Sequence, residues 1–105
     1  MKCISIDREA LLKKLRTIAI EAKKQFSEIE DIRIFGSLAK NQETGISDID
    51  LLVIAQTEKV HPIERVKPYF YFFSERIEIG IDLLVAKPDE LDNFKDILKE
   101  SYSLL

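Results

Sequence analysis

The sequence has 105 residues, of which 46% are hydrophobic and 33% are charged, and its formal net charge is −3. This length fits one domain over residues 1–105 with a single core, and the apolar content excludes a chain that is disordered throughout. The acidic balance disfavours stable binding to a long nucleic acid, because such binding usually needs a basic surface.

The expected location is the cytoplasm. No apolar run approaches the roughly 18 residues of a membrane span, and the residues after Met1 do not read as a secretory leader. Cys3 is the single cysteine, so an internal disulfide cannot form and a reducing compartment is the natural expectation. No histidine is tied to Cys3 in the sequence, which disfavours catalysis by this thiol.

The N-terminal part of the chain predicts a helix and then a strand. The helix is expected over residues 7–26, with Asp7 as its N-cap. Its apolar side chains recur at intervals of four, three and four residues and form one stripe, which consists of Leu11, Leu15, Ile18 and Ala22. Apolar and polar residues alternate over 29–35, as in a strand. A short helix is expected over 38–42.

The middle of the chain predicts two further strands around a helix. The apolar run in residues 49–54 is typical of a strand covered on both faces. Pro62 is expected to open a helix that Pro68 limits to about Val66. Clear alternation then predicts a strand over residues 76–85, with its isoleucines on one face.

A last helix is expected from Pro88 to about Ser101, since an apolar residue recurs there with helical spacing. Helices and strands therefore alternate along the chain. This order predicts an α/β (α+β) fold, in which helices pack on one side of a small mixed sheet of three or more strands.

Two carboxylates open the second predicted strand. Asp48 and Asp50 are two residues apart, so they project from the same face of the strand, whereas Ile49 between them turns toward the core. Two negative charges this close repel each other, and a cation between them relieves the repulsion. Mg²⁺ suits the pair, because it takes oxygen ligands and often uses only one or two carboxylates together with substrate phosphates.

A third carboxylate belongs to the same hypothesis. Asp82 lies in an otherwise apolar predicted strand, where a buried carboxylate without a partner would be costly. If this strand lies beside the one that carries Asp48 and Asp50, the strands are only about 5 Å apart. The three aspartates then form a triad able to hold two metal ions for a phosphoryl transfer.

A phosphate site is expected between the first strand and the short helix. Gly36 allows a phosphate to approach the backbone closely, and the N–H groups of a helix start suit an anion together with the Ser37 hydroxyl. Lys40 adds a positive charge about one turn later.

Each motif alone has a plainer interpretation. The two aspartates of 48–50 occur often as an exposed or capping pair, a Gly-Ser pair is usually a simple turn, and Asp82 fits the polar side of a sheet. Their order and spacing in one short chain make the combined site the better hypothesis.

The segments 36–40 and 47–53, which read GSLAK and SDIDLLV, resemble the signature of the polymerase-β-like nucleotidyltransferases. The short length resembles the minimal nucleotidyltransferases (MNT) within that superfamily, including MntA-like antitoxins. The resemblance implies that Gly36 and Ser37 hold a nucleoside triphosphate. It also implies that Asp48 and Asp50 bind two Mg²⁺ ions, and that Asp82 joins one metal and helps to activate the attacking hydroxyl. The family often has Arg-Gly where this chain has Lys40 and Asn41; lysine keeps the charge but not the bidentate fork.

The resemblance further implies a reaction and a partner. It implies transfer of a nucleoside monophosphate, AMP from ATP, to a protein hydroxyl, with a HEPN-type toxin as the acceptor and the chain as its antitoxin. The alternative is a non-catalytic module that neutralises a partner by steric contact. A transferase acting on RNA is disfavoured by the acidic balance. The sequence leaves the oligomeric state open.

Two further features have open interpretations. Residues 69–73 are five consecutive aromatics, which favours either a core segment or a contact surface for a partner. His61, the only histidine, precedes Pro62 and is expected to be a surface residue rather than a metal ligand or a base.

Overall fold

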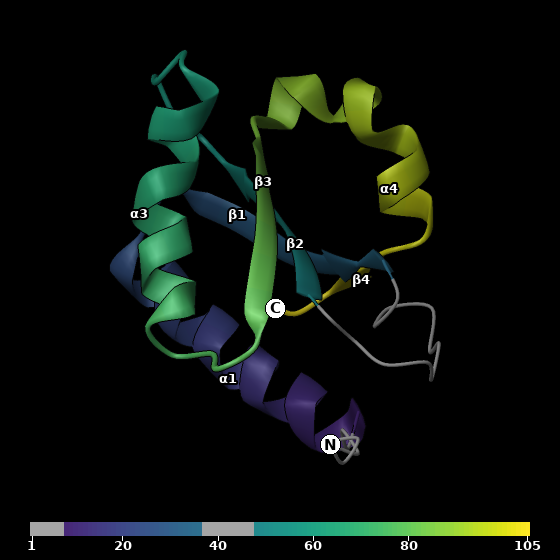
Figure 1. The fold of residues 1–105 in the computed structure, drawn as a ribbon. Coiled ribbons are helices and arrows are strands. Elements are labelled where there is room, and N and C mark those ends of the chain that lie inside the picture. Colours follow the sequence, from purple (N-terminus) through teal and green to yellow (C-terminus); the bar gives the residue numbers. More distant parts are fainter. Residues whose placement is uncertain (1–7, 37–47) are drawn as a thin grey trace.

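The computed structural model describes residues 8–36 and 48–105, and within them four strands form one mixed sheet in the order β3-β2-β1-β4 (Figure 1). Strand β1 is antiparallel to β2 and to β4, whereas β2 and β3 are parallel. The elements in chain order are α1 (Arg8–Gln25), β1 (Ile29–Phe35), β2 (Asp48–Ala55), α3 (Pro62–Ser74), β3 (Gly80–Ala86), the 3₁₀ helix η1 (Pro88–Phe94), α4 (Lys95–Lys99) and β4 (Tyr102–Ser103). The predicted α/β fold class is confirmed, and the short helix expected over 38–42 lies outside the described residues.

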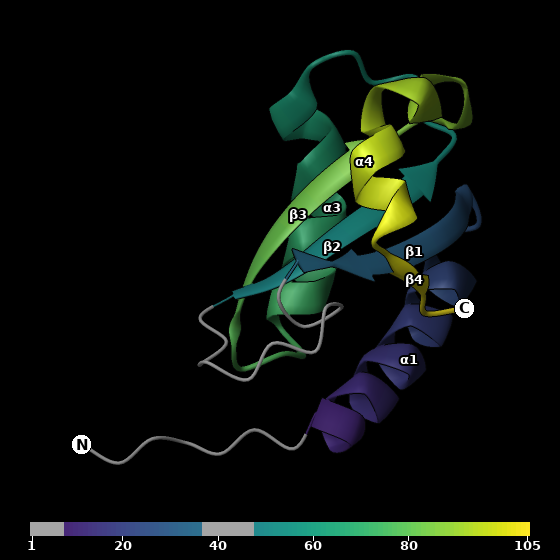
Figure 2. The ribbon, with the colours of Figure 1, turned by 90° about the vertical axis from the view of Figure 1, so that its right-hand side faces the viewer.

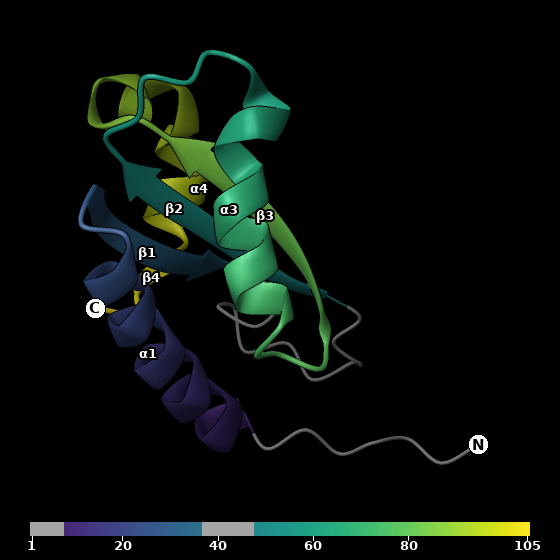
Figure 3. The ribbon, with the colours of Figure 1, turned by 90° about the vertical axis from the view of Figure 1, so that its left-hand side faces the viewer.

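The main core lies between one face of the sheet and the helices α1 and α3. Figure 3 shows both helices in front of this face. The helix α1 buries Leu15, Ile18, Ala19 and Ala22, which include part of the predicted stripe. From β2, Ile49, Leu51 and Val53 are fully buried on the same side. Because each buried aliphatic side chain contributes about 2 kcal/mol, this face fixes how β2 is oriented.

The helix α3 does not end before Pro68, so that expectation was wrong. It runs from Pro62 to Ser74 with Pro68 inside it. An interior proline costs about 3 kcal/mol, because it lacks an N–H and crowds the preceding turn. The helix buries Tyr69, Phe72 and Phe73 after the proline, and each such side chain contributes about 2 kcal/mol or more. Burial of these aromatics therefore outweighs the cost of the proline.

The aromatic run is divided between core and surface. Phe26, at the end of α1, makes edge-to-face contacts with the rings of Tyr69 and Phe72, and the Tyr69 hydroxyl donates a 2.7 Å hydrogen bond to the Glu28 carboxylate. The core interpretation holds for these side chains. Phe70 and Tyr71 point outward instead, with 36% and 57% of their surface exposed.

The opposite face of the sheet carries a second, smaller core beneath the C-terminal segment, as Figure 2 shows with α4 in front of β2. Leu52, Ile54 and Ala86 are buried there. The partly buried residues packed on them are Phe35, Leu91, Phe94, Ile97 and Leu98. The two long helices thus share one side, whereas η1 and α4, which were expected as a helix on that same side, partly cover the other one.

The boundaries near the C-terminus differ from those predicted. Strand β3 begins at Gly80 rather than at residue 76, because the amides of Arg76 and Ile77 still donate to the Phe73 carbonyl at the end of α3. The single helix expected over 88–101 is instead divided into η1 and α4, and the short strand β4 follows it.

Strand β4 is held at the sheet edge by β1. The Arg33 side chain donates hydrogen bonds to the Ser101 hydroxyl (2.6 Å) and carbonyl (3.2 Å). The Leu104 amide donates to the Ile32 carbonyl at 2.8 Å, and the Leu104 side chain is 1% exposed. None of the helices in the described part of the chain has the length and apolar character needed to cross a bilayer.

Candidate active site

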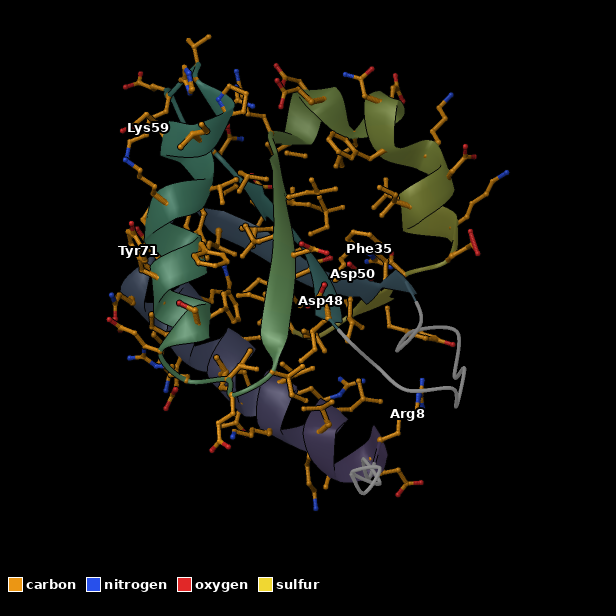
Figure 4. The ribbon with its side chains drawn as sticks, viewed as in Figure 1. Arg8, Phe35, Asp48, Asp50, Lys59 and Tyr71 are labelled. Atoms are coloured by element: carbon orange, nitrogen blue, oxygen red, sulfur yellow. The ribbon has the colours of Figure 1, made fainter. Side chains whose placement is uncertain are left out.

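The parallel pairing of β2 and β3 brings two of the predicted acidic residues side by side. Asp50 lies opposite Asp82 in the register, and Asp48 lies opposite Gly80. Because side chains alternate along a strand, Asp48 and Asp50 share the face of Leu52, which is the face that α4 partly covers. Figure 4 shows Asp48 and Asp50 on this side of β2, with Phe35 beside Asp50.

The Asp50 carboxyl is in an unfavourable electrostatic environment. Partial burial raises its pKa, and the negative charges of Asp82 and Asp48 and a hydrogen bond with the Asp82 side chain raise it further. Without a cation nearby, the Asp50 carboxyl is therefore harder to ionise than an exposed one. A divalent cation would supply positive charge beside Asp50 and favour its ionised form.

The acidic residues fit a metal that is completed by its substrate rather than a closed protein cage. In residues 8–36 and 48–105, no three Asp, Glu, His or Cys side chains gather closely enough to form a ready metal centre. Asp48 is exposed at the start of β2 and acts on Asp50 through its charge. Mg²⁺ commonly binds through one or two carboxylates together with substrate phosphates and water, and the Asp50–Asp82 pair provides oxygen ligands of that kind.

Gly36 directly follows β1 and makes room for Asp50. Its φ is +75°, in the left-handed region that side chains rarely adopt. A Cβ atom at this position would overlap Asp50 Oδ2 and lie 2.9 Å from Asp50 Cγ. The sequence suggested that this glycine serves a phosphate; the structure adds that it lets the carboxylate of Asp50 lie against the backbone.

The remaining predicted site residues divide into two groups. Ser37 and Lys40 lie outside the described residues. His61 is exposed and caps α3, with its Nδ1 accepting a 3.2 Å hydrogen bond from the Ile63 amide. This contact agrees with its expected place on the surface.

The C-terminal segment builds a wall near Gly36 that no pattern in the sequence indicated. A depression of about 150 Å³ adjoins Gly36 between the end of β1 and α4. Its lining residues are Phe35, Gly36, Asp96, Ile97 and Glu100. No motif marks Asp96 or Glu100, because they reach this place only through the fold of η1 and α4 over the sheet.

Comparison with known proteins gives matches over most of the chain. The family described as Polymerase beta, Nucleotidyltransferase matches residues 16–104. A protein of Methanocaldococcus jannaschii that bears the name "Putative protein adenylyltransferase" is 33% identical over 78 residues, which are 70% of this chain and 76% of that protein.

Solved structures share the fold. A crystal structure described as "a putative nucleotidyltransferase from Sulfolobus solfataricus" has a TM-score of 0.65 and 27% identity, over 91% of this chain and 80% of that chain. A crystal structure described as a toxin-antitoxin with AMP-PNP has a TM-score of 0.58 and covers 95% of this chain and 73% of that chain. At 18% identity, this second likeness concerns the fold alone.

Proposed function

Because this chain belongs to the polymerase beta nucleotidyltransferase family, we propose that it transfers AMP from ATP to a hydroxyl group of another protein in a Mg²⁺-dependent reaction. The observation that carries the proposal is the pairing of Asp50 with Asp82 on neighbouring strands. Burial and the facing carboxylate of Asp82 raise the pKa of Asp50, so the pair of negative charges is unfavourable in the free protein. The pair becomes favourable when a divalent metal ion, which also binds the phosphates of the substrate, lies between the two carboxylates.

The proposed roles follow from position. Asp48, Asp50 and Asp82 would hold two Mg²⁺ ions, and these ions would neutralise the charge of the triphosphate. Gly36 leaves space at the edge of the site, and Ser37 and Lys40 are proposed to contact the phosphates. Asp82 is exposed on β3, where its carboxylate can accept a proton from an approaching hydroxyl.

The proposed reaction is an in-line displacement at the α-phosphorus of ATP. The acceptor oxygen forms a bond to this phosphorus, the bond to the bridging oxygen of the β-phosphate breaks, and pyrophosphate leaves. The proton of the acceptor hydroxyl passes to a carboxylate oxygen, for which Asp82 is the proposed acceptor. The products are AMP-protein and pyrophosphate.

A protein acceptor suits a domain of this size. The sheet and its helices leave no second domain within the described residues that could hold a polymer, and the net charge of −3 does not favour a nucleic acid. The M. jannaschii relative is named as a protein adenylyltransferase, and a structural neighbour is a toxin-antitoxin complex. The name of the relative supports a protein acceptor. The choice of a HEPN-type toxin as that acceptor, with this chain as its antitoxin, comes from the resemblance of the sequence to the minimal nucleotidyltransferases.

A second candidate function is neutralisation of a partner by contact alone. It is favoured by the apolar groove of about 290 Å³ on the outer side of α3. The groove is lined by Pro62, Ile63, Val66, Lys67, Phe70 and Tyr71. This groove lies on the α3 side of the sheet, away from Asp50, so it does not contribute to the proposed chemistry.

Mass spectrometry of the partner distinguishes the two candidates. A purified candidate acceptor, a HEPN-type toxin, is incubated with the chain, ATP and Mg²⁺, and a parallel sample contains EDTA. We expect one or more additions of AMP on a hydroxyl side chain, absent with EDTA and absent with Asp48→Asn. Neutralisation of the partner by wild type and Asp48→Asn alike, with no change of mass, would support the contact function instead.

A further inference from the structure

Two residues that line the depression beside Gly36, Phe35 and Gly36 itself, are also neighbours of Asp50. Phe35 lies directly opposite Asp50 in the β1–β2 ladder, and Gly36 contacts the Asp50 carboxylate closely enough that a Cβ would overlap it. Both residues also line the depression, whose far wall is formed by α4. A molecule whose phosphates lie at Asp50 therefore has this depression within reach of its remaining atoms.

The residues that line the depression determine which part of a phosphate-bearing ligand fits into it. Asp96 presents a carboxylate, which repels phosphate groups and accepts hydrogen bonds from N–H donors. The Phe35 ring and the Ile97 side chain supply apolar surface, and an aromatic ring is a stacking surface for any nucleobase. At about 150 Å³ the depression is smaller than a typical pocket for a whole ligand of drug size, so it suits one ring system rather than a whole nucleotide.

We propose that this depression receives the nucleobase of the donor nucleotide, and that Asp96 favours a base with an exocyclic amino group. The inference rests on the proposed function, since it assumes that a nucleoside triphosphate binds at Asp50. The base lies between Phe35 and Ile97, and its amino group donates to the Asp96 carboxylate. Adenine meets this requirement at its 6-position. Hypoxanthine presents a carbonyl oxygen there, which a carboxylate repels.

The test compares the binding of ATP, ITP and inorganic triphosphate, each with Mg²⁺, by isothermal titration calorimetry. No acceptor protein is present, so the readout is affinity rather than turnover. ATP and ITP differ along one edge of the base: adenine has an amino donor at position 6 and an acceptor at N1, whereas hypoxanthine has a carbonyl at position 6 and a donor at N1. The Asp96 variant below therefore shows whether Asp96 is the residue that reads this edge. We expect wild type to bind ATP at least about tenfold more tightly than ITP, because a mismatched polar contact costs roughly 1–3 kcal/mol.

The variant Asp96→Ala should reduce the ATP-to-ITP ratio to near one and leave triphosphate binding unchanged. Asp96 is exposed in α4, so its replacement should not disturb the fold. Asp92→Ala, an exposed acidic residue of η1 outside the lining, is the matched control and should keep the wild-type ratio.

The outcomes separate this inference from the proposed function. Equal affinity for ATP and ITP in wild type, or a ratio unchanged by Asp96→Ala, would overturn the nucleobase site while leaving the transferase proposal intact. Absence of binding for ATP and triphosphate alike would overturn both.

A second variant, Phe35→Leu, keeps an apolar side chain in the small core but removes the stacking surface. It should weaken ATP binding more than triphosphate binding, and equal weakening of both would contradict stacking.

Discussion

Asp50 is the residue at which local geometry and electrostatics meet. It is aligned with Asp82 by the parallel register of β2 and β3, with Phe35 by the antiparallel register of β1 and β2, and with Gly36 by close contact. Because side chains alternate along a strand, the sequence alone predicted that Asp48 and Asp50 share a face. The register with Asp82 depends on which strands become neighbours, and sequence pattern alone only suggested that arrangement.

The raised pKa of Asp50 predicts a pH-dependent effect on stability. A carboxyl whose pKa is raised above its ordinary value of 3.8 stays protonated in the folded protein after the unfolded chain has lost the proton. Its contribution is therefore complete below that value and is lost as pH rises through the folded pKa. In the absence of metal, Asp50→Asn should be more stable than wild type at pH 7 by about 0.5 kcal/mol, the size of a cross-strand pair of like charges.

Urea unfolding in EDTA at several pH values measures this difference. The advantage of Asp50→Asn should shrink as pH falls toward 4 and should vanish below it. The exposed Asp92, for which the same substitution leaves the charge pair intact, is the control and should show no such trend. An Asn variant that is less stable than wild type at pH 7 would contradict the repulsion between Asp50 and Asp82.

Gly36 predicts a second effect at this scale. Gly36→Ala must accommodate a φ of +75° and an overlap with Asp50, so it should lower the free energy of unfolding by about 2 kcal/mol. Gly80→Ala is the matched control, because Gly80, at the exposed start of β3, is not among the glycines with a positive φ in the described residues. In the background Asp50→Ala, the cost of Gly36→Ala should fall, since the overlap is gone. An unchanged cost would show that backbone strain alone matters.

At the scale of whole elements, the spacing of apolar residues predicted a helix or strand well where the element buries a single stripe or face in a single core. The stripe of α1, the strand β1 and the apolar run of β2 were predicted within one or two residues of their observed ends. The Pro68 rule failed in α3, because the helix buries three aromatic side chains beyond the proline. The rule counts only the local free-energy cost of a proline in a helix, and the free energy gained by burying these side chains in the tertiary structure is larger.

The C-terminal segment could not be predicted in the same way. Strand β4 has only two residues, Tyr102 and Ser103, which is too short for alternation to indicate a strand. Its pairing depends on Arg33, a residue of β1 far away in the sequence that bonds Ser101. The candidate site was affected in the same manner. The acidic motif was visible in sequence, whereas Asp96 in the opposite wall was not, because its position follows from this return of the chain.

This dependence on Arg33 predicts a loss of order in β4. Arg33→Met keeps the aliphatic stem and removes the bonds to Ser101 and the ion pair with Asp31 at 3.0 Å. It should lower the free energy of unfolding by about 2 kcal/mol, since a partly buried polar group loses its partner. Hydrogen exchange at the Leu104 amide, which bonds the Ile32 carbonyl, should accelerate. Arg16→Met, at an exposed position of α1, should leave that exchange rate unchanged.

At the scale of the whole molecule, the main hydrophobic core and the candidate active site lie on opposite faces of the sheet. The main core fills the side of α1 and α3, and the carboxylates occupy the side that η1 and α4 cover only in part. Strand β3 is the edge of the described sheet, and Asp82 and Leu84 are exposed along it. A side chain of another protein can therefore approach the Asp50–Asp82 pair from this edge, which suits the proposed transfer to a protein hydroxyl.

The central claim is that the carboxylates of Asp50 and Asp82 are needed for AMP transfer and not for the stability of the fold. The most direct measurement is the single-turnover rate of transfer from labelled ATP to the proposed acceptor, a HEPN-type toxin, made with wild type, Asp50→Asn, Asp82→Asn and the control Asp92→Asn. Co-elution with the partner in gel filtration is recorded for each variant. The first two substitutions should lower the rate by at least about 100-fold, with docking and thermal stability retained, and the control should match wild type. Transfer at the wild-type rate by Asp50→Asn or Asp82→Asn would contradict this claim.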